Sequence, residues 1–200
     1  MTVAPVAPTR RMPRAQRREQ IIKAATRAFA RAGFTNTGLD AIASEASVSP
    51  VILYRHFASK ADLYRAVLQI ASNRLRDAVG TENFDDNSLP ALIRAASADP
   101  HGFRLLFRHA AREPEFNDEI DTIRTTATEV THRALTDIAN DEWRAWAARL
   151  LPSLTTDAVI AWLDTGQPDP DQAATRIRRI TDAVIEAANE PSADPSLRSS

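Results

Sequence analysis

The stretch "SPVILYRHFASKADLYRAV", residues 49–67, places two helix starts close together around a run of four large side chains. Ser49 followed by Pro50 predicts a capped helix with proline at its first position, ending near Phe57. Residues 54–57, Tyr-Arg-His-Phe, point in four directions around such a helix. They cannot all be core residues, so we expect a short helix with one apolar face and polar or charged groups on the others.

Similar signals recur along the chain and predict an all-α fold of about nine helices. Thr37 with Asp40 and Ser59 with Asp62 both have the spacing of a capping box, and Asp99-Pro100 and Asp169-Pro170 predict caps followed by proline at the first helical position. Gly33 marks a helix end, and apolar residues recur every three or four positions. The expected helices span about 14–32, 37–46, 49–57, 59–79, 88–98, 100–111, 115–140, 142–165 and 170–188.

The composition excludes several functional classes. The 200 residues are 44% hydrophobic and include no Cys, so disulfides, thiol nucleophiles and Cys-based zinc sites are excluded. No metal-binding H-E-x-x-H, Gly-rich phosphate loop or G-x-S-x-G motif is present, and we expect no metal, no cofactor and no enzymatic activity. The absence of a signal peptide and of an apolar run long enough for a membrane span predicts a cytoplasmic protein.

The net charge of −1 conceals a strong asymmetry. Residues 1–80 hold thirteen Lys and Arg against five Asp and Glu, whereas residues 81–200 hold twelve against twenty-one. A basic front part on an acidic remainder indicates one region that meets a polyanion and one that does not.

The two short helices joined by residues 46–49 have the proportions of a helix-turn-helix, whose second helix enters the DNA major groove. Val48, Leu53 and Phe57 fall on one face of the second helix and are expected to anchor it. The other faces then leave five side chains for DNA: Val51, Ile52, Tyr54, Arg55 and His56.

The segment "GFTNTGLDAIASEASVSPVILYRHFASKADLYRAVL", residues 33–68, resembles the amino-terminal signature of the TetR family of bacterial transcriptional regulators. The resemblance implies that Tyr54 and Lys60 contact backbone phosphates and that Thr37 caps the second helix and offers a phosphate contact. It also implies that the exposed face of the recognition helix carries the DNA-reading residues, and that a basic arm adds contacts. These residues are Ser49, Pro50, Val51, Ile52, Arg55 and His56 in the helix, and Arg10, Arg11, Arg14, Arg17 and Arg18 in the arm.

The segment departs from the family pattern at three places. Ser47 stands in a turn where glycine is common, and Gly38 stands where a hydroxyl residue is frequent. Val51 and Ile52 replace small or hydroxyl residues. Because branched apolar groups cannot hydrogen-bond base edges but can pack on thymine methyls, we expect thymine contacts combined with one hydrogen bond from Arg55 or His56.

The expected organisation is a disordered basic arm (1–12), a helix-turn-helix domain (13–58), a linking helix (59–79), an effector-binding and dimerisation domain (80–188) and a disordered tail (189–200). The resemblance implies a homodimer through the last two helices on a palindromic operator, a small apolar or amphipathic effector, and action as a repressor. A regulator controlled by a protein partner remains an alternative, and an all-α enzyme is a weaker one.

Apolar stripes supply candidates for the pocket and for the dimer interface, although both stripes could instead complete the monomer core. Five threonines between 122 and 131 include some near the apolar edge of their helix. The expected pocket residues are Phe103, Phe107, His109, Ile123, Ala127, Trp143 and Trp162. The expected interface residues are Leu150, Leu154, Ala158, Ala161, Ile177, Ile180 and Val184.

Overall fold

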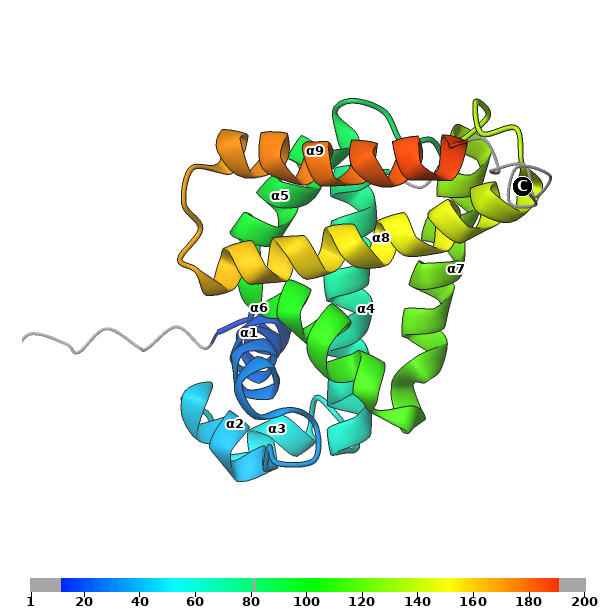
Figure 1. The fold of residues 1–200 in the computed structure, drawn as a ribbon. Coiled ribbons are helices and arrows are strands. Elements are labelled where there is room, and N and C mark those ends of the chain that lie inside the picture. The colour runs from blue at the N-terminus through cyan, green and yellow to red at the C-terminus, as the bar shows by residue number, and fades with distance from the viewer. Residues whose placement is uncertain (1–11, 81, 191–200) are drawn as a thin grey trace, which may run out of the picture. The chain divides into compact units, whose positions relative to one another are not determined.

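The computed structural model describes residues 12–80 and 82–190, and every regular element in these ranges is a helix. Arg10, Arg11 and nearly all of the two expected disordered segments lie outside the described residues. The all-α prediction is confirmed (Figure 1). The α-helices are α1 (Arg14–Ala32), α2 (Leu39–Glu45), α3 (Pro50–Tyr54), α4 (Lys60–Val79), α5 (Ser88–Ala98), α6 (Pro100–Arg104), α7 (Asn117–Ala134), α8 (Asp141–Asp164) and α9 (Pro170–Asn189).

The starts of α4, α6 and α9 carry the side-chain caps expected from sequence. The Ser59 hydroxyl accepts a hydrogen bond from the Asp62 amide at 3.0 Å at the start of α4. Asp99 accepts from the Gly102 amide at 2.9 Å before Pro100, and Asp169 accepts from the Gln172 amide at 3.0 Å before Pro170. Each cap satisfies an amide that the helix leaves without a partner, which is why these boundaries could be predicted.

The chain divides into two compact units, Met1–Val67 and Leu68–Ser200, and the division falls within α4. We call them the amino-terminal and the carboxy-terminal unit. The amino-terminal unit contains α1 to α3 and the first turns of α4. Its core is an aromatic cluster: the rings of Phe29 and Tyr64 meet edge to face at 4.8 Å, and Phe34 lies 5.0 Å from Tyr64. Because Phe29 and Tyr64 are fully buried, the cluster fixes the start of α4 against α1.

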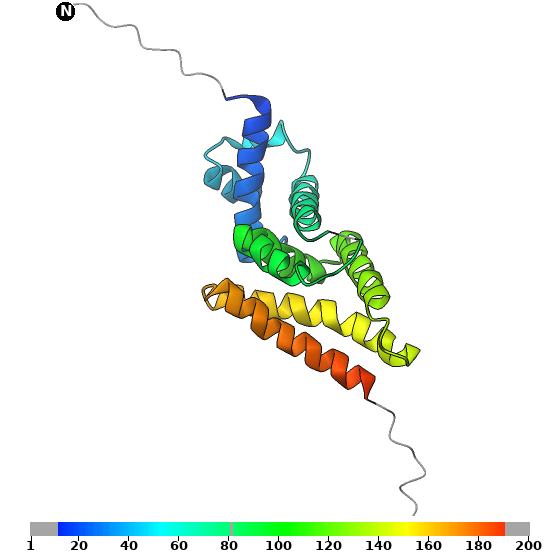
Figure 2. The same cartoon turned by 90° about the horizontal axis from the view of Figure 1, so that it is seen from above.

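In the carboxy-terminal unit, α8 and α9 lie side by side and are joined by a short turn (Figures 1 and 2). One core cluster, which includes Ile93, Phe103 and Trp162, joins α5, α6, α8 and α9. A second cluster lies near the start of α8 and includes Ile138 and Leu151. The two clusters hold the ends of the α8–α9 pair.

Two predicted helices are wrong in their extent. The expected helix 100–111 is α6 followed by a π-helical turn (Leu105–His109) and a 3-10 turn (Ala110–Arg112). The expected helix 115–140 shrinks to α7, after a 3-10 turn at Pro114–Phe116. Ile138 misled the prediction, because it stands four positions beyond Ala134 and is buried, but it packs from the loop before α8.

Candidate functional site

The expected recognition helix, α3, forms as predicted at its start and ends earlier than predicted. The Ser49 hydroxyl accepts from the Ile52 amide at 3.4 Å, and Pro50 occupies the first helical position. Regular helix ends at Tyr54, and residues 55–57 continue as a tight turn in which the amides of His56 and Phe57 both donate to the Leu53 carbonyl.

The exposure of α3 separates anchoring residues from presenting ones. Leu53 and Phe57 are buried, whereas Val51 and Tyr54 are 61% and 56% exposed. Arg55 is exposed, and Ile52 is half-buried. The five-residue helix and the turn after it therefore hold their anchors in the core while they display an aliphatic group, a phenol and a guanidinium.

Arginines from the start of α1 surround the end of the recognition helix. The Arg18 guanidinium lies 5.0 Å above the ring of Phe57. Burial lowers the pKa of the half-buried His56, and the charges of Arg14, Arg18 and Arg17 lower it further. The imidazole is therefore neutral near pH 7, with one ring nitrogen able to donate a hydrogen bond and the other able to accept one.

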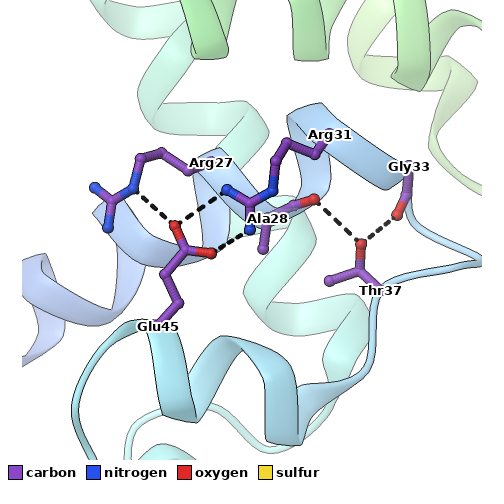
Figure 3. A network of polar contacts seen from close by, with 6 residues as sticks. All are labelled: Arg27, Ala28, Arg31, Gly33, Thr37 and Glu45. Carbon is purple, nitrogen blue, oxygen red and sulfur yellow. Dashed lines mark hydrogen bonds and ion pairs between the residues drawn. The ribbon is translucent and has the colours of Figure 1, made fainter.

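A polar network braces α2 against α1 (Figure 3). The Glu45 carboxylate accepts from Arg27 Nε at 2.8 Å and from both terminal nitrogens of Arg31. Gln20 Nε2 adds a 2.6 Å bond to the Ala46 carbonyl at the end of α2. The hydrogen bonds from Arg31 and then from Arg27 hold the pKa of Glu45 below its ordinary value, so the carboxylate is charged at neutral pH.

Thr37 does not cap α2, and this prediction is wrong. Gly38 is the residue before the helix, and no side chain caps it. Thr37 is buried, and its hydroxyl donates to the Gly33 carbonyl at 2.7 Å, closing the loop after α1 (Figure 3). A buried hydroxyl that donates inward does not reach a phosphate, so we assign Thr37 a structural role.

Lys60 has a structural role that the sequence did not predict. Its ammonium donates to the carbonyls of Phe34 and Thr37 at 2.8 and 3.1 Å, and it lies 4.3 Å over the Phe34 ring. Two of its three hydrogens thus hold the loop between α1 and α2. One hydrogen remains for the expected phosphate contact.

The turn of the helix-turn-helix carries backbone strain at the position where the sequence departs from the family pattern. Ser47 has a φ of 52°, in the left-handed region that glycine adopts without cost. The turn tolerates this exposed side chain, because Ser47 and Val48 donate their amides to the carbonyls of Ser44 and Ala43.

The carboxy-terminal unit contains a cavity of about 660 Å³. This volume lies within the range of small-molecule sites. Its walls come from five helices, and aliphatic side chains alternate with hydroxyls. The lining includes Ser72, Leu75 and Arg76 from α4, Leu89 and Leu92 from α5, Ile123, Thr126, Val130 and Thr131 from α7, Thr155 and Thr156 from α8, and Arg178, Thr181 and Ile185 from α9.

Of the seven pocket residues expected from sequence, only Ile123 lines this cavity. Phe103 and Trp162 are core, Trp162 donating its indole N–H to the Pro168 carbonyl at 2.7 Å. Phe107 packs against that core, and Trp143 is exposed at an edge-to-face contact with Trp146. Neither His109 nor Ala127 lines the cavity. The threonines of α7 were the usable signal, since Thr122, Thr126 and Thr131 all line it.

The residues expected at the dimer interface fall into two groups. Ile177 is core, and Ala158 and Val184 pack partly buried against the core clusters. Ile180 and Ala161 are exposed, and Leu150 and Leu154 are half-buried. The exposed Trp143 and Trp146 extend this apolar surface along α8.

Metal sites and membrane-spanning helices are both absent from residues 12–80 and 82–190. No group of three His, Asp or Glu side chains in these ranges is placed to hold a metal ion. None of the described helices combines the length and the apolar character that a membrane crossing needs.

Known proteins resemble the chain in both sequence and fold. Residues 21–67 match the family model of bacterial regulatory proteins of the tetR family. The chain is 33% identical over 179 residues to the HTH-type transcriptional activator FasR of Mycolicibacterium smegmatis, a match that covers 82% of this chain and 80% of that protein. The chain belongs to the TetR family. It is therefore a DNA-binding transcriptional regulator.

Solved TetR-like structures share the fold over nearly the whole chain. A TetR-like transcriptional regulator from Rhodococcus sp. RHA1 superposes with a TM-score of 0.73 at 24% identity, covering 89% of this chain and 96% of that one. NalD of Pseudomonas aeruginosa, the secondary repressor of a multidrug efflux pump, superposes with a TM-score of 0.60 at 21% identity, covering 86% and 98%. At these identities the likeness supports the fold.

Proposed function

We propose that this TetR-family regulator acts in the cytoplasm as a homodimer on a palindromic operator and responds to a small molecule in its carboxy-terminal unit. The separation of buried from exposed side chains in α3 and in the turn after it supports the DNA-binding part of the proposal. Leu53 and Phe57 anchor the helix, while Val51, Tyr54 and Arg55 remain exposed beside the arginines of α1. Such a helix presents its outer face to the major groove.

Each presented group has a partner in duplex DNA. Val51 packs on thymine methyls, and Arg55 or the neutral His56 supplies a hydrogen bond to a base edge. Tyr54, Arg14 and the remaining hydrogen of Lys60 contact phosphates, which position the helix without reading sequence.

Binding to the promoter beside its own gene tests this part of the proposal. We expect an electrophoretic shift that weakens steeply as salt rises, because phosphate contacts release counterions. Replacing operator thymines by uracil should lower the affinity, because the methyl groups in contact with Val51 are lost. Affinity unchanged by uracil would refute the methyl contacts, and indifference to DNA at low salt would refute the DNA-binding role of α3.

The exposed apolar residues of α8 and α9 support a homodimer. Trp143, Trp146 and Ile180 are each at least 40% exposed, on the two helices that lie side by side. A second copy would remove these side chains from water. Sedimentation should give a dimer, and Ile180→Asp should give a monomer with its helical circular dichroism retained. A dimer that survives Ile180→Asp would place the interface elsewhere.

The cavity supports control by a small molecule rather than by a protein partner. α4 is one continuous helix whose first turn carries Lys60 and whose later turns carry the cavity residues Ser72, Leu75 and Arg76. A ligand that binds one conformation of the dimer more tightly shifts the population towards it. The doubly substituted variant Leu89→Trp, Thr155→Trp would mimic occupancy. We expect altered operator affinity with an intact dimer, and unaltered affinity would contradict the coupling.

Activation of transcription is better supported than the repression that we expected from the sequence. The relative at 33% identity is named an activator, and its match extends through both units. The named repressor NalD is 21% identical. A promoter–reporter fusion should lose expression when the regulator is deleted, whereas increased expression would restore the repressor prediction.

A further inference from the structure

The charged groups of the cavity balance one another. Arg76 and Arg178 are the cationic side chains among its lining residues, and Asp85 and Asp182 are the anionic ones. Arg178 is ion-paired with Asp86 at 2.5 Å and also donates to the Asp86 carbonyl at 2.6 Å. Arg76 donates to the Asn73 side chain. Among the described residues, the only hydrogen-bond partner of Arg76 is a neutral amide, and Arg76 shares the lining with Asp85 and Asp182. A ligand carboxylate would thus meet one unpaired cation and two like charges, which does not compensate its loss of hydration.

Most threonine hydroxyls of the cavity wall already donate their hydrogen to a backbone carbonyl. Thr131 donates to the Ala127 carbonyl at 2.8 Å, Thr155 to Leu151 at 2.7 Å and Thr181 to Arg178 at 2.8 Å. A hydroxyl has one hydrogen to donate. These side chains therefore contribute mainly methyl groups and hydrogen-bond acceptors, and no donor.

Two hydroxyls of the lining differ from the rest. Ser72 on α4 is only 8% exposed, and its hydroxyl makes no hydrogen bond with any described residue. Its oxygen is not sealed inside protein, so its open side is the cavity that it lines. Thr126 on α7, half-buried in the same lining, likewise has no partner among the described side chains and backbone groups. Both hydroxyls therefore keep a hydrogen that a ligand in the cavity can accept.

We propose that the cavity binds an uncharged, mainly apolar molecule with one neutral oxygen function, such as an alcohol, which hydrogen-bonds to Ser72 and Thr126. The aliphatic wall takes the apolar body. This inference rests on the proposed ligand response and specifies the ligand class of that same cavity.

Three matched probes test the class on the full-length protein: dodecan-1-ol, dodecanoate and dodecylammonium. They share a twelve-carbon chain and differ in the charge of the head group. Isothermal titration calorimetry should show that the alcohol binds at least about tenfold more tightly than either ion, because a charged head group loses much more hydration on entering the cavity than a hydroxyl does.

Two substitutions test the anchors. Ser72→Ala and Thr126→Val should each weaken alcohol binding about three- to tenfold, since each removes one hydrogen bond. Thr126→Ser keeps the hydroxyl and should retain the affinity. Thr175→Val is the matched control, because the Thr175 hydroxyl already donates to the Asp171 carbonyl and Thr175 does not line the cavity, and it should change the affinity less than about twofold. The melting temperature of each variant reports its folding.

The outcomes separate this inference from the proposed function. Tighter binding of dodecanoate than of the alcohol, or equal affinity in Ser72→Ala, Thr126→Val and Thr175→Val, would overturn the assigned class and anchors. Binding of none of the three probes would overturn it too. The proposed ligand response is decided separately by the cavity-filling variant, whose effect on operator affinity requires no ligand.

Discussion

The two units differ in where their functional polar groups lie: on the outer surface of one and around an internal cavity in the other. In the amino-terminal unit the arginines and the phenol of Tyr54 face outward over a core closed by the Phe29–Tyr64 aromatic contact. In the carboxy-terminal unit, hydroxyls face a cavity of about 660 Å³. The difference fits the two proposed tasks: a filled core keeps a small DNA-reading surface rigid, whereas a unit that binds a ligand leaves space inside and gives up packing there.

The largest expected effect is on the free energy of unfolding: truncating a buried side chain should lower it more in the amino-terminal unit than at the cavity wall of the carboxy-terminal unit. Phe29→Ala should lower the free energy of unfolding by about 3–5 kcal/mol, because it empties a filled aromatic core. Ile123→Ala, at the cavity wall and half-buried, should cost only about 1–2 kcal/mol because less apolar area is lost. Urea unfolding followed by circular dichroism measures both. Equal losses would contradict the contrast in packing.

A change at the exposed face of α3 should affect DNA binding and leave stability unchanged. Tyr54→Phe removes a hydroxyl from a side chain that is 56% exposed, and we expect about five- to tenfold weaker operator binding from the loss of one hydrogen bond to phosphate. Fluorescence anisotropy with labelled operator measures it. Thr175→Val, which removes an exposed hydroxyl from α9, is the control. Equal affinities of Tyr54→Phe and wild type would exclude the phosphate contact.

The carboxylate that braces α2 should give the amino-terminal unit a pH-dependent stability. Because the pKa of Glu45 is lowered in the folded protein by its hydrogen bonds with Arg31 and Arg27, its contribution is complete above about pH 5 and is lost as the pH falls through the folded-state value. Both arginines are more than a third exposed, so solvent screening limits the contribution.

We expect Glu45→Gln to lower the free energy of unfolding by about 1 kcal/mol at pH 7 and by much less at pH 3. Urea titrations at the two pH values measure the difference. Glu19→Gln is the control, since Glu19 forms an exposed i,i+4 pair with Lys23 that contributes about 0.3 kcal/mol. A loss that is the same at both pH values would show that the brace does not act through charge.

The smallest expected effect concerns the strained turn. Ser47→Gly should raise the free energy of unfolding by about 0.5 kcal/mol, because relief of the left-handed strain exceeds the extra entropy that glycine loses on folding. Ser44→Gly, the same substitution within α2, should lower it by about 0.5–1 kcal/mol. Opposite signs three positions apart test the backbone argument by thermal unfolding. Equal signs would refute it.

Sequence signals were most reliable where one residue acts on its near neighbours. The caps at Ser49, Ser59, Asp99 and Asp169 were predicted, because a side chain that satisfies an amide three positions ahead needs no distant partner. Thr37 has the same local pattern, yet its hydroxyl is taken by the Gly33 carbonyl at the end of α1. Where local and tertiary partners compete, a local signal cannot decide the outcome.

The sequence alone determined the all-α fold, the short capped helix α3 and the family, because helix caps and apolar spacing are local properties of the chain. Tertiary structure alone decided that Trp162 is core, that Lys60 holds the α1–α2 loop, and that Ser72 and Thr126 share one cavity. The physical reason is that a cavity is the space left between five helices. Which side chains line the cavity depends on how those helices pack against one another. The spacing of residues within a single helix does not contain this information.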